Sequence, residues 1–289
     1  MKRAGLIGFG IQRSLTPAMH MREGEAQGIE YRYELIDLNE RKLTSDALES
    51  LVIDAEERGF CGLNITYPCK QRIVPLLTEM SEDARKLGAV NTVVLQDGRR
   101  IGHNTDWWGF AEGIRRQLPG ADLGSVVQIG AGGAGAATAF AMLQMGARAL
   151  TIFDLDNLRA LDLTALLTRL FPDAKIKAGD DLEQAMAGAT GLVHATPMGM
   201  DKHPGLPLPA ELLNPPLWVA EIVYFPLETA LLQAARRRGC RVANGGGMAV
   251  FQAVGAFSLF TGLQPDADRM VEHFKTLTGY DTRSVARMA

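Results

Sequence analysis

The chain has 289 residues, of which 47% are hydrophobic and 22% charged, and its formal net charge is −3. This composition is typical of a soluble globular protein, excludes a largely disordered one, and leaves enough length for two domains. The sequence has no basic cluster that predicts a nucleic-acid partner and no apolar run long enough to span a membrane, and its three cysteines, which lack metal-ligand spacing, predict a reducing cytoplasm and no structural metal.

The first third of the chain alternates between strand-like and helix-like segments. Strands are expected over residues 3–9, 31–38 and 60–67, and helices over residues 17–28 and 44–59. A short helix is expected after Pro68, and residues 89–96 and 99–104 are expected to pair as a hairpin around Asp97-Gly98. Alternation of this kind predicts α/β layers with a largely parallel sheet.

A second series begins with a helix expected over residues 106–118. A continuously apolar strand over 125–130 is followed by a helix over 132–146 and a strand over 149–154. Further strands are expected over 191–196, 217–224 and 240–244, and the basic triplet 236–238 suits the solvated end of a helix. The chain then continues into two helices, over residues 247–262 and 266–279.

The sequence GAGGAG follows the strand at 125–130 and opens a helix. Here Gly130 permits a tight turn, Gly132 lets the backbone approach a pyrophosphate, and Gly135 lets helix and strand pack closely. The helix N-terminus offers free N–H groups and a partial positive charge to the phosphates. The alternative is a glycine-rich turn without a ligand, but an acid, Asp154, at the end of the next strand favours a dinucleotide site. The rival loop GFGIQR, after the first strand, lacks the third glycine.

We therefore predict an α/β protein of two domains. An N-terminal α/β domain would cover residues 1–106, and a Rossmann dinucleotide-binding domain would cover residues 107–246. Residues 247–289 would form C-terminal helices that return to the first domain.

Two carboxylates bear on the choice of cofactor. Asp154 can accept hydrogen bonds from the adenosine ribose, and Asp154 with Asp156 would repel a 2′-phosphate. The pattern therefore favours NAD over NADP, although Arg159 stands close enough in sequence to leave NADP open. For Asp156 itself, a helix N-cap is the interpretation that we favour.

Lys70 and Asp106 are candidates for acid–base chemistry. Lys70 follows Pro68 and is expected in the first turn of a helix, where the helix dipole disfavours a cation. A solvated surface lysine is the more common outcome for such a residue. Asp106 precedes a helix, so an N-cap or first-turn acid is its default role. Asn91 lies within an apolar strand and needs a hydrogen-bond partner if it is buried.

The segment RSLTPAMH places the hydroxyls of Ser14 and Thr16 directly before Pro17. Thr16 fits an N-cap with proline at the first helical position. The same helix start attracts a carboxylate, so one structure can serve as both cap and anion site. The five histidines are scattered, and none has the spacing of a metal ligand.

Seven motifs in order resemble the shikimate/quinate dehydrogenase family over nearly the whole chain: SLTPAMH, GLNITYPCK, GAVNTV, GHNTDWWGF, GAGGAGAAT, HATPMGM and GMAVFQAVGAF. The resemblance implies a two-domain enzyme whose N-terminal domain, residues 1–106, holds the substrate. The enzyme would transfer a hydride reversibly between a nicotinamide cofactor and a ring carbon bearing a hydroxyl. It implies Lys70 and Asp106 as the catalytic pair. It also implies two groups of substrate ligands: Ser14 and Thr16 for the carboxylate, and Thr66, Asn91 and Gln252 for ring hydroxyls.

The sequence departs from the commonest shikimate dehydrogenase pattern at two places. Thr16 stands where serine is usual, and FDLD stands where members preferring NADP carry an Asn-Arg pair. Both departures look like the NAD-using quinate/shikimate dehydrogenases of quinate catabolism, so we expect oxidation of quinate to 3-dehydroquinate and of shikimate to 3-dehydroshikimate. The residues expected to bind NAD are Gly130, Ala131, Gly132, Gly133, Ala134, Gly135, Asp154, Arg159, Thr196, Pro197, Met198, Val223, Gly246 and Met248.

Other functions stay open at this point. The chain could be a paralogue specific for shikimate or an amino-shikimate analogue, or a non-catalytic NAD-binding regulatory module, which would need neither Lys70 nor Asp106. A one-carbon folate dehydrogenase has a similar plan, but the hydroxyl pair and the GHNTD motif disfavour it. The expected partner is a small-molecule acid, with no nucleic acid and no membrane, and the resemblance leaves a homodimer open.

Overall fold

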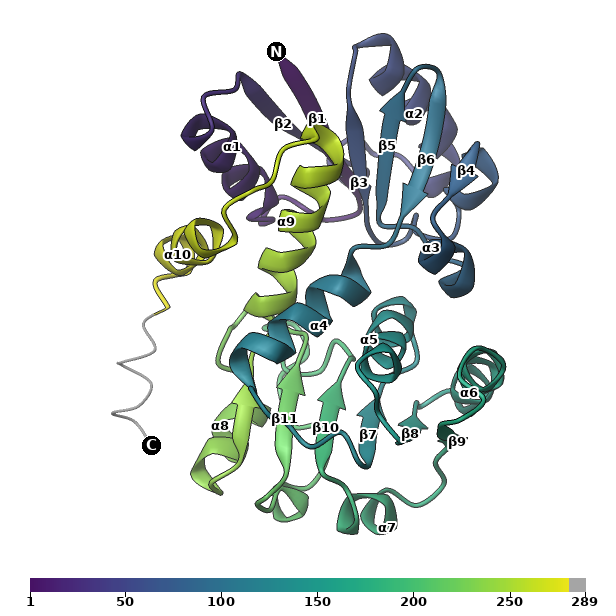
Figure 1. Cartoon of the computed structure of the whole chain (residues 1–289), viewed down its shortest axis with the longest axis vertical. Coiled ribbons are helices and arrows are strands. Elements are labelled where there is room, and N and C mark those ends of the chain that lie inside the picture. Colours follow the sequence, from purple (N-terminus) through teal and green to yellow (C-terminus); the bar gives the residue numbers. More distant parts are fainter. Residues whose placement is uncertain (281–289) are drawn as a thin grey trace. The chain divides into compact units, whose positions relative to one another are not determined.

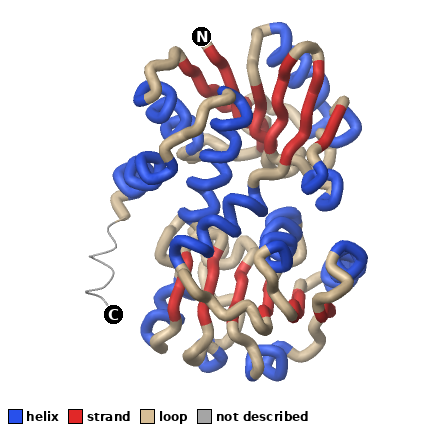
Figure 2. The backbone as a smooth tube through the Cα atoms, in the orientation of Figure 1, coloured by secondary structure: helices blue, strands red, loops and turns tan. Residues whose placement is uncertain are grey.

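The computed structural model describes residues 1–280. The chain divides into two compact units, the first formed by Met1–Thr105 with Val250–Gly279 and the second containing Asp106–Ala249. Figure 2 shows the strands of each unit lying side by side as one sheet with helices beside it. Residues 281–289 of the predicted C-terminal segment lie outside the described residues.

The first unit contains a six-stranded sheet in the order β2-β1-β3-β5-β6-β4 (Figure 1). β1 pairs with β2 and β3 in parallel, whereas β5 is antiparallel to both β3 and β6, so the sheet is mixed where a largely parallel one was expected. The antiparallel part is the predicted hairpin, in which Asp97 and Gly98 both have positive φ, as tight hairpin turns require. The strands are β1 (Lys2–Gly8), β2 (Tyr31–Asp37), β3 (Gly62–Ile65), β4 (Glu79–Met80), β5 (Thr92–Gln96) and β6 (Arg99–His103).

Helices pack on both faces of this sheet. On one face, Phe257 and Phe260 join Tyr31 and Tyr33 in a buried cluster. On the other face, apolar residues such as Val52 join the sheet core. The helices are α1 (Thr16–Ala26), α2 (Leu48–Glu57), α3 (Glu82–Leu87), α9 (Gly246–Thr261), which also extends into the second unit, and α10 (Ala267–Thr278), with 3-10 turns at Ser45–Ala47 and Val74–Leu76.

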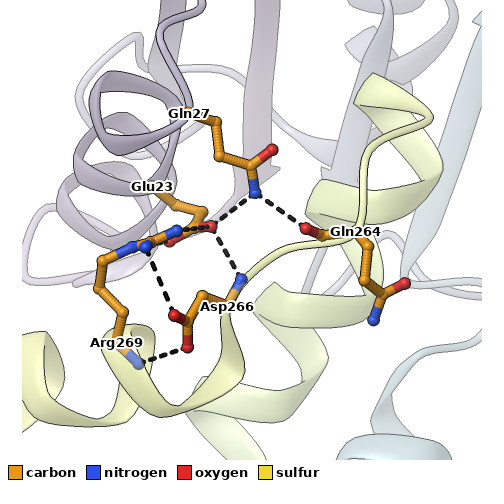
Figure 3. Close-up of polar contacts among 5 residues, drawn as sticks. All are labelled: Glu23, Gln27, Gln264, Asp266 and Arg269. Atoms are coloured by element: carbon orange, nitrogen blue, oxygen red, sulfur yellow. Dashed lines mark hydrogen bonds and ion pairs between the residues drawn. The ribbon is translucent and has the colours of Figure 1, made fainter.

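A buried carboxylate fastens α10 to α1 (Figure 3). The Glu23 side chain is 0% exposed, and Arg269 donates to its two oxygens at 2.8 and 2.6 Å. The Asp266 N–H and the Gln27 amide also donate to Glu23, at 2.9 and 2.7 Å. Burial alone raises the pKa of the Glu23 carboxyl, but these hydrogen bonds hold the pKa below its usual value. The C-terminal helix is therefore held against the helix that follows the Ser14–Thr16 segment.

The second unit contains a parallel six-stranded sheet in the order β12-β11-β10-β7-β8-β9 (Figure 1). This is the doubly wound order of the predicted Rossmann-type fold. The strands are β7 (Val126–Ile129), β8 (Ala149–Phe153), β9 (Lys175–Ala178), β10 (Gly191–His194), β11 (Trp218–Glu221) and β12 (Arg241–Ala243). The helices are α4 (Asp106–Gln117), α5 (Gly133–Gln144), α6 (Asn157–Leu170), α7 (Leu182–Ala187) and α8 (Ala230–Arg237), with a 3-10 turn at Ala210–Leu212.

Two findings concern classes of site that the composition disfavoured. None of the helices formed by residues 1–280 combines the length and apolar character needed to cross a membrane. Among the same residues, no group of three His, Cys, Asp or Glu side chains could hold a metal ion. Cys61, Cys69 and Cys240 are free thiols, and burial raises the pKa of each.

Candidate active site

Hydrogen bonds tie together the segments of the first unit that carry predicted site residues. The Thr66 N–H, just after β3, donates to the Ile7 carbonyl of β1 at 2.9 Å. The Val90 N–H donates to the carbonyl of Lys70 at 3.0 Å, and the Ile65 N–H donates to the carbonyl of Asn91 at 2.8 Å. The segments around positions 66, 70 and 91 are therefore neighbours.

Asn91 connects this group of segments to the start of α4. Its side chain is buried, and its carbonyl oxygen accepts the Thr105 N–H at 2.7 Å while its amide donates to the Thr105 hydroxyl at 3.0 Å. The sequence required a partner for a buried Asn91, and Thr105 is that partner. Asp106 follows Thr105 directly, begins α4 and is itself buried. The first-turn position of Asp106 agrees with the default role given to it above.

The helix predicted after Pro68 is absent from residues 68–73, so the placing of Lys70 in a first helical turn is wrong. Residues 70–73 form turns, and the first regular element after them is the 3-10 turn at Val74–Leu76. In an α-helix the Val74 N–H would donate to the Lys70 carbonyl; instead it donates to Gln71 at 3.2 Å, and Val90 takes the Lys70 carbonyl. A contact distant in sequence thus replaces the local helix. The half-buried Lys70 has further interactions of its own.

The Ser14–Thr16 pair also differs from expectation. α1 begins at Thr16 with Pro17 in its first turn, and Leu15 rather than Thr16 holds the N-cap position, without a side-chain hydrogen bond. The capping contact comes from Ser14, whose hydroxyl oxygen accepts the Thr16 N–H at 3.3 Å. The prediction that Thr16 is the N-cap is therefore wrong. Thr16 is the first residue of the helix, and its own N–H donates to the Ser14 hydroxyl. Both hydroxyls nevertheless lie at the start of α1.

Asp37 at the end of β2 orders the loop that leads to Ser14, which the sequence had not indicated. Its buried carboxylate accepts the N–H groups of Gly10 and Ile11, each at 2.9 Å, and the Gln12 amide at 3.1 Å. Burial raises the pKa of Asp37, but these donors hold the pKa below its usual value. Because Asp37 occupies the N–H groups of the GFGIQR loop, this loop offers a phosphate fewer donors than GAGGAG does.

The glycine loop of the second unit has the geometry expected of a phosphate site. Gly130 has φ of +110°, and a Cβ added there would lie 2.4 Å from the Ala195 carbonyl oxygen. A Cβ at Gly135 would lie 2.2 Å from the Gly130 oxygen, so helix and strand approach as predicted. At Gly132 and Gly133 an added Cβ would meet no atom of the described residues within 4 Å. The backbone of Gly132 and Gly133 at the N-terminus of α5 therefore has open space beside it.

Hydrogen bonds from the Gln128 side chain support the glycine loop. Gln128 is the one polar residue of the otherwise apolar β7, is 0% exposed, and donates its amide to the carbonyls of Gly130 and Gly135, both at 2.8 Å. Its own oxygen accepts the Thr138 hydroxyl at 2.9 Å. A polar residue in an otherwise apolar strand, two positions before the loop, is the sequence signal that was missed.

The acids after β8 occupy two different roles. The Asp154 carboxylate accepts the Ala131 N–H at 2.7 Å and the Asp156 N–H at 2.9 Å, so it lies against the glycine loop. Asp156 caps α6 by accepting the Leu158 N–H at 3.1 Å, as we favoured. Arg159 lies 3.3 Å from Asp156 in an exposed ion pair. The guanidinium that could serve a 2′-phosphate is thus already beside a carboxylate.

The remaining predicted cofactor residues follow β10, β11 and β12. Thr196, Pro197 and Met198 follow β10, with Thr196 next to Gly130, and Val223 follows β11. Gly246 and Met248 begin α9, and a Cβ on Gly245 would lie 2.3 Å from the Ile222 oxygen, so the last two loops touch. The structure thus gathers these residues at the carboxyl ends of the parallel strands, where open α/β sheets bind ligands. Gln252 lies on α9 within the first unit and is half-buried.

Known proteins are similar to this chain in sequence and in fold. Residues 6–93 match the shikimate dehydrogenase substrate binding domain. The chain is 53% identical over 277 residues to a Streptomyces avermitilis protein named shikimate dehydrogenase (NADP(+)), covering 95% of each chain. It is 48% identical over 276 residues to a Corynebacterium efficiens protein named quinate/shikimate dehydrogenase (NAD(+)), covering 94% of this chain and 97% of that one. The solved quinate dehydrogenase from Corynebacterium glutamicum in complex with NAD is 46% identical, with a TM-score of 0.90 over 95% of this chain and 99% of that one.

Proposed function

This chain belongs to the shikimate dehydrogenase family, and on that premise we propose that it is an NAD-dependent quinate/shikimate dehydrogenase. It oxidises quinate to 3-dehydroquinate and shikimate to 3-dehydroshikimate, reversibly. One ring carbon loses a hydride, its hydroxyl loses a proton, and a carbonyl forms. The bound nicotinamide supplies the hydride acceptor. The names of the Corynebacterium relatives support this assignment.

Lys70 and Asp106 form the acid–base pair. The amine of Lys70 takes the hydroxyl proton, and the Asp106 carboxylate stabilises the ammonium that forms. The observation that carries this assignment is the buried Asn91, since its side chain fixes Thr105, which precedes Asp106, while the neighbouring Val90 holds the Lys70 carbonyl. Metal ligands are not required for this chemistry.

The first unit binds the cyclic acid. Ser14 and Thr16 donate to the substrate carboxylate at the start of α1, where the partial positive charge of the helix end adds to the attraction. Thr66, Asn91 and Gln252 bind ring hydroxyls. Asp37 contributes indirectly, because it fixes the loop that leads into Ser14.

The second unit binds NAD through the glycine loop, the residues after β10 and β11, and the start of α9. Asp154 carries the preference for NAD, because its carboxylate faces the loop that would hold the adenosine pyrophosphate and would repel a 2′-phosphate. Leu155, which is fully exposed, adds no positive charge there. The three free thiols suit a cytoplasmic enzyme.

A second candidate is an NADP-dependent shikimate dehydrogenase, which the names of relatives at 53% identity favour. Steady-state kinetics of the purified protein with quinate and shikimate, each with NAD and with NADP, separate the two. We expect turnover of both acids with NAD and a much lower kcat/KM with NADP. Higher kcat/KM with NADP and no quinate turnover would establish the second candidate. Binding of NAD without turnover of either acid would make the protein a binding module instead.

A further inference from the structure

The carboxyl ends of β10 and β11 carry a buried histidine–glutamate pair that the proposed chemistry does not use. His194 and Glu221 are register partners in the two parallel strands, and both side chains are 0% exposed. Nδ1 of His194 lies 3.0 and 2.9 Å from the two carboxylate oxygens of Glu221. Burying a carboxylate costs folding free energy unless it is paired and hydrogen-bonded, so the contacts of this pair show what it stabilises.

Each remaining polar atom of the pair reaches a loop at the edge of the sheet. Nε2 of His194 lies 2.6 Å from the Thr196 hydroxyl, which in turn accepts the Met198 N–H at 3.2 Å. One oxygen of Glu221 accepts the Val223 N–H at 3.0 Å, and the other accepts the Thr229 hydroxyl, which caps α8, at 3.3 Å.

One arrangement of protons satisfies every one of these contacts. Nδ1–H of His194 can donate to the Glu221 carboxylate while Nε2 accepts the Thr196 O–H, which leaves the Thr196 oxygen to accept from Met198. Thr196, Met198 and Val223 are three of the residues proposed to bind the cofactor, and all three are held by this single pair.

The order of the strands shows which part of the cofactor lies here. The half-sheet β7-β8-β9 contains the glycine loop and Asp154, which serve the pyrophosphate and the adenosine. The other half, β10-β11-β12, lies on the opposite side of β7, so a dinucleotide that extends from the glycine loop across the sheet brings its nicotinamide to the loops after β10 and β11.

We propose that His194 and Glu221 are positioning residues for the nicotinamide half of the cofactor. They touch neither substrate nor reacting atoms, and they act by fixing Thr196, Met198 and Val223. The inference rests on the proposed function, since it assumes a nicotinamide dinucleotide on this sheet.

The test compares NAD with ADP-ribose, which has the same adenosine and pyrophosphate but lacks nicotinamide. Dissociation constants for both ligands are measured by fluorescence titration for the wild type, His194→Asn and Glu221→Gln. We expect the Kd for NAD to rise about ten-fold or more, the loss of one buried hydrogen bond, while the Kd for ADP-ribose stays within about three-fold. The KM for the cyclic acid should change little.

Two further variants keep the result interpretable. Glu23→Gln removes a buried carboxylate from the first unit and weakens its contact with Arg269. It should leave the dissociation constants for NAD and ADP-ribose unchanged. Thr196→Val leaves the His194–Glu221 pair in place and should show the same selective loss of NAD affinity. Thr196→Ser keeps the hydroxyl and should bind NAD as the wild type does. These two variants test the inference even where the variants of the pair fail to fold. An equal loss of NAD and ADP-ribose, or no loss of either, overturns the inference. A wild type that binds ADP-ribose but neither NAD nor NADP would overturn the proposed function as well.

Discussion

The side-chain carbonyl of Asn91 accepts the backbone N–H of Thr105 at 2.7 Å, in the interior of the first unit. This contact joins the residue before β5 to the residue before α4, whose first residue is Asp106. A residue proposed to bind a ring hydroxyl thus also holds the backbone beside a residue proposed for catalysis.

Asn91→Leu should lower both stability and activity. The apolar side chain would leave the buried Thr105 N–H without its acceptor, which costs about 2 kcal/mol of unfolding free energy. Urea unfolding measures this loss, and kcat should fall because Asp106 is no longer fixed. Asn91→Asp keeps the acceptor for the Thr105 N–H and should be less destabilised. Equal stability of the wild type and Asn91→Leu would contradict this role.

Gln128→Met should weaken cofactor binding with little effect on the chemical step. The methionine fills similar space but cannot donate to the Gly130 and Gly135 carbonyls, so the pyrophosphate loop loses its brace. We expect the KM for NAD to rise about ten-fold, with kcat within about three-fold. Gln184, which lies in α7 and is not part of this brace, provides a matched control as Gln184→Met. A fall in kcat without a change in the KM for NAD would rule out a loop-bracing role.

Asp154→Asn should narrow the preference for NAD over NADP. The amide oxygen can still accept the Ala131 N–H, so the loop stays in place, but the charge that repels a 2′-phosphate is gone. The measurement is the ratio of kcat/KM with NAD to kcat/KM with NADP, which should fall by about ten-fold or more. Asp181→Asn is the control, because Asp181 is likewise a helix N-cap but belongs to α7. An unchanged ratio in Asp154→Asn would remove this carboxylate from cofactor selection.

Unfolding free energy should fall as the pH drops below 6.5 because of His20. Burial lowers the pKa of His20 from 6.5 to about 3, so the folded protein keeps it neutral while the unfolded chain binds a proton below 6.5. The unfolded state then binds more protons than the folded state. The contribution of His20 to the unfolding free energy is fully present above pH 6.5 and is lost as the pH falls toward 3. Between pH 6.5 and 5 this group should contribute a loss of about 2 kcal/mol.

The comparison of wild type with His20→Gln isolates this contribution. Burial also lowers the pKa of His103 and His273, so the wild-type slope contains more than one histidine. The lowered carboxyl pKa values of Glu23 and Asp37 act at lower pH, because their stabilisation is lost only as the carboxylates protonate. Urea unfolding from pH 7.5 to 5 should give a shallower pH dependence for His20→Gln, and parallel curves would disprove the assignment.

Local patterns in the sequence predicted the glycine loop and five of the six strands of the second unit, but gave no range for β9, α6, α7 or α8. The GAGGAG loop lies between an apolar strand and a small-residue helix, and Asp154 follows the next strand. All the residues that define this motif therefore lie within about 25 positions of the sequence. The helix α3 had equally local signals, Ser81 as N-cap and Gly88 with φ of 63° at its end, and it was nevertheless missed.

The sequence did not predict features that depend on contacts between distant segments. The helix expected after Pro68 gives way to turns because Val90, twenty residues later, takes the Lys70 carbonyl. The pairing of His194 with Glu221 follows from the register of β10 with β11, which no single segment reveals. Gln128 and Asp37 act on loops whose final shape depends on neighbouring strands. Long-range hydrogen bonding therefore accounts for what local periodicity left out.

The kcat of Lys70→Met for quinate oxidation with NAD tests the central claim most directly. Methionine keeps much of the side-chain volume but cannot accept a proton, so kcat should fall by about 10² to 10⁴-fold, with a much smaller change in the KM for quinate. Circular dichroism and NAD binding must match the wild type for the comparison to hold. A folded Lys70→Met variant that turns over quinate at the wild-type rate would contradict the proposed mechanism.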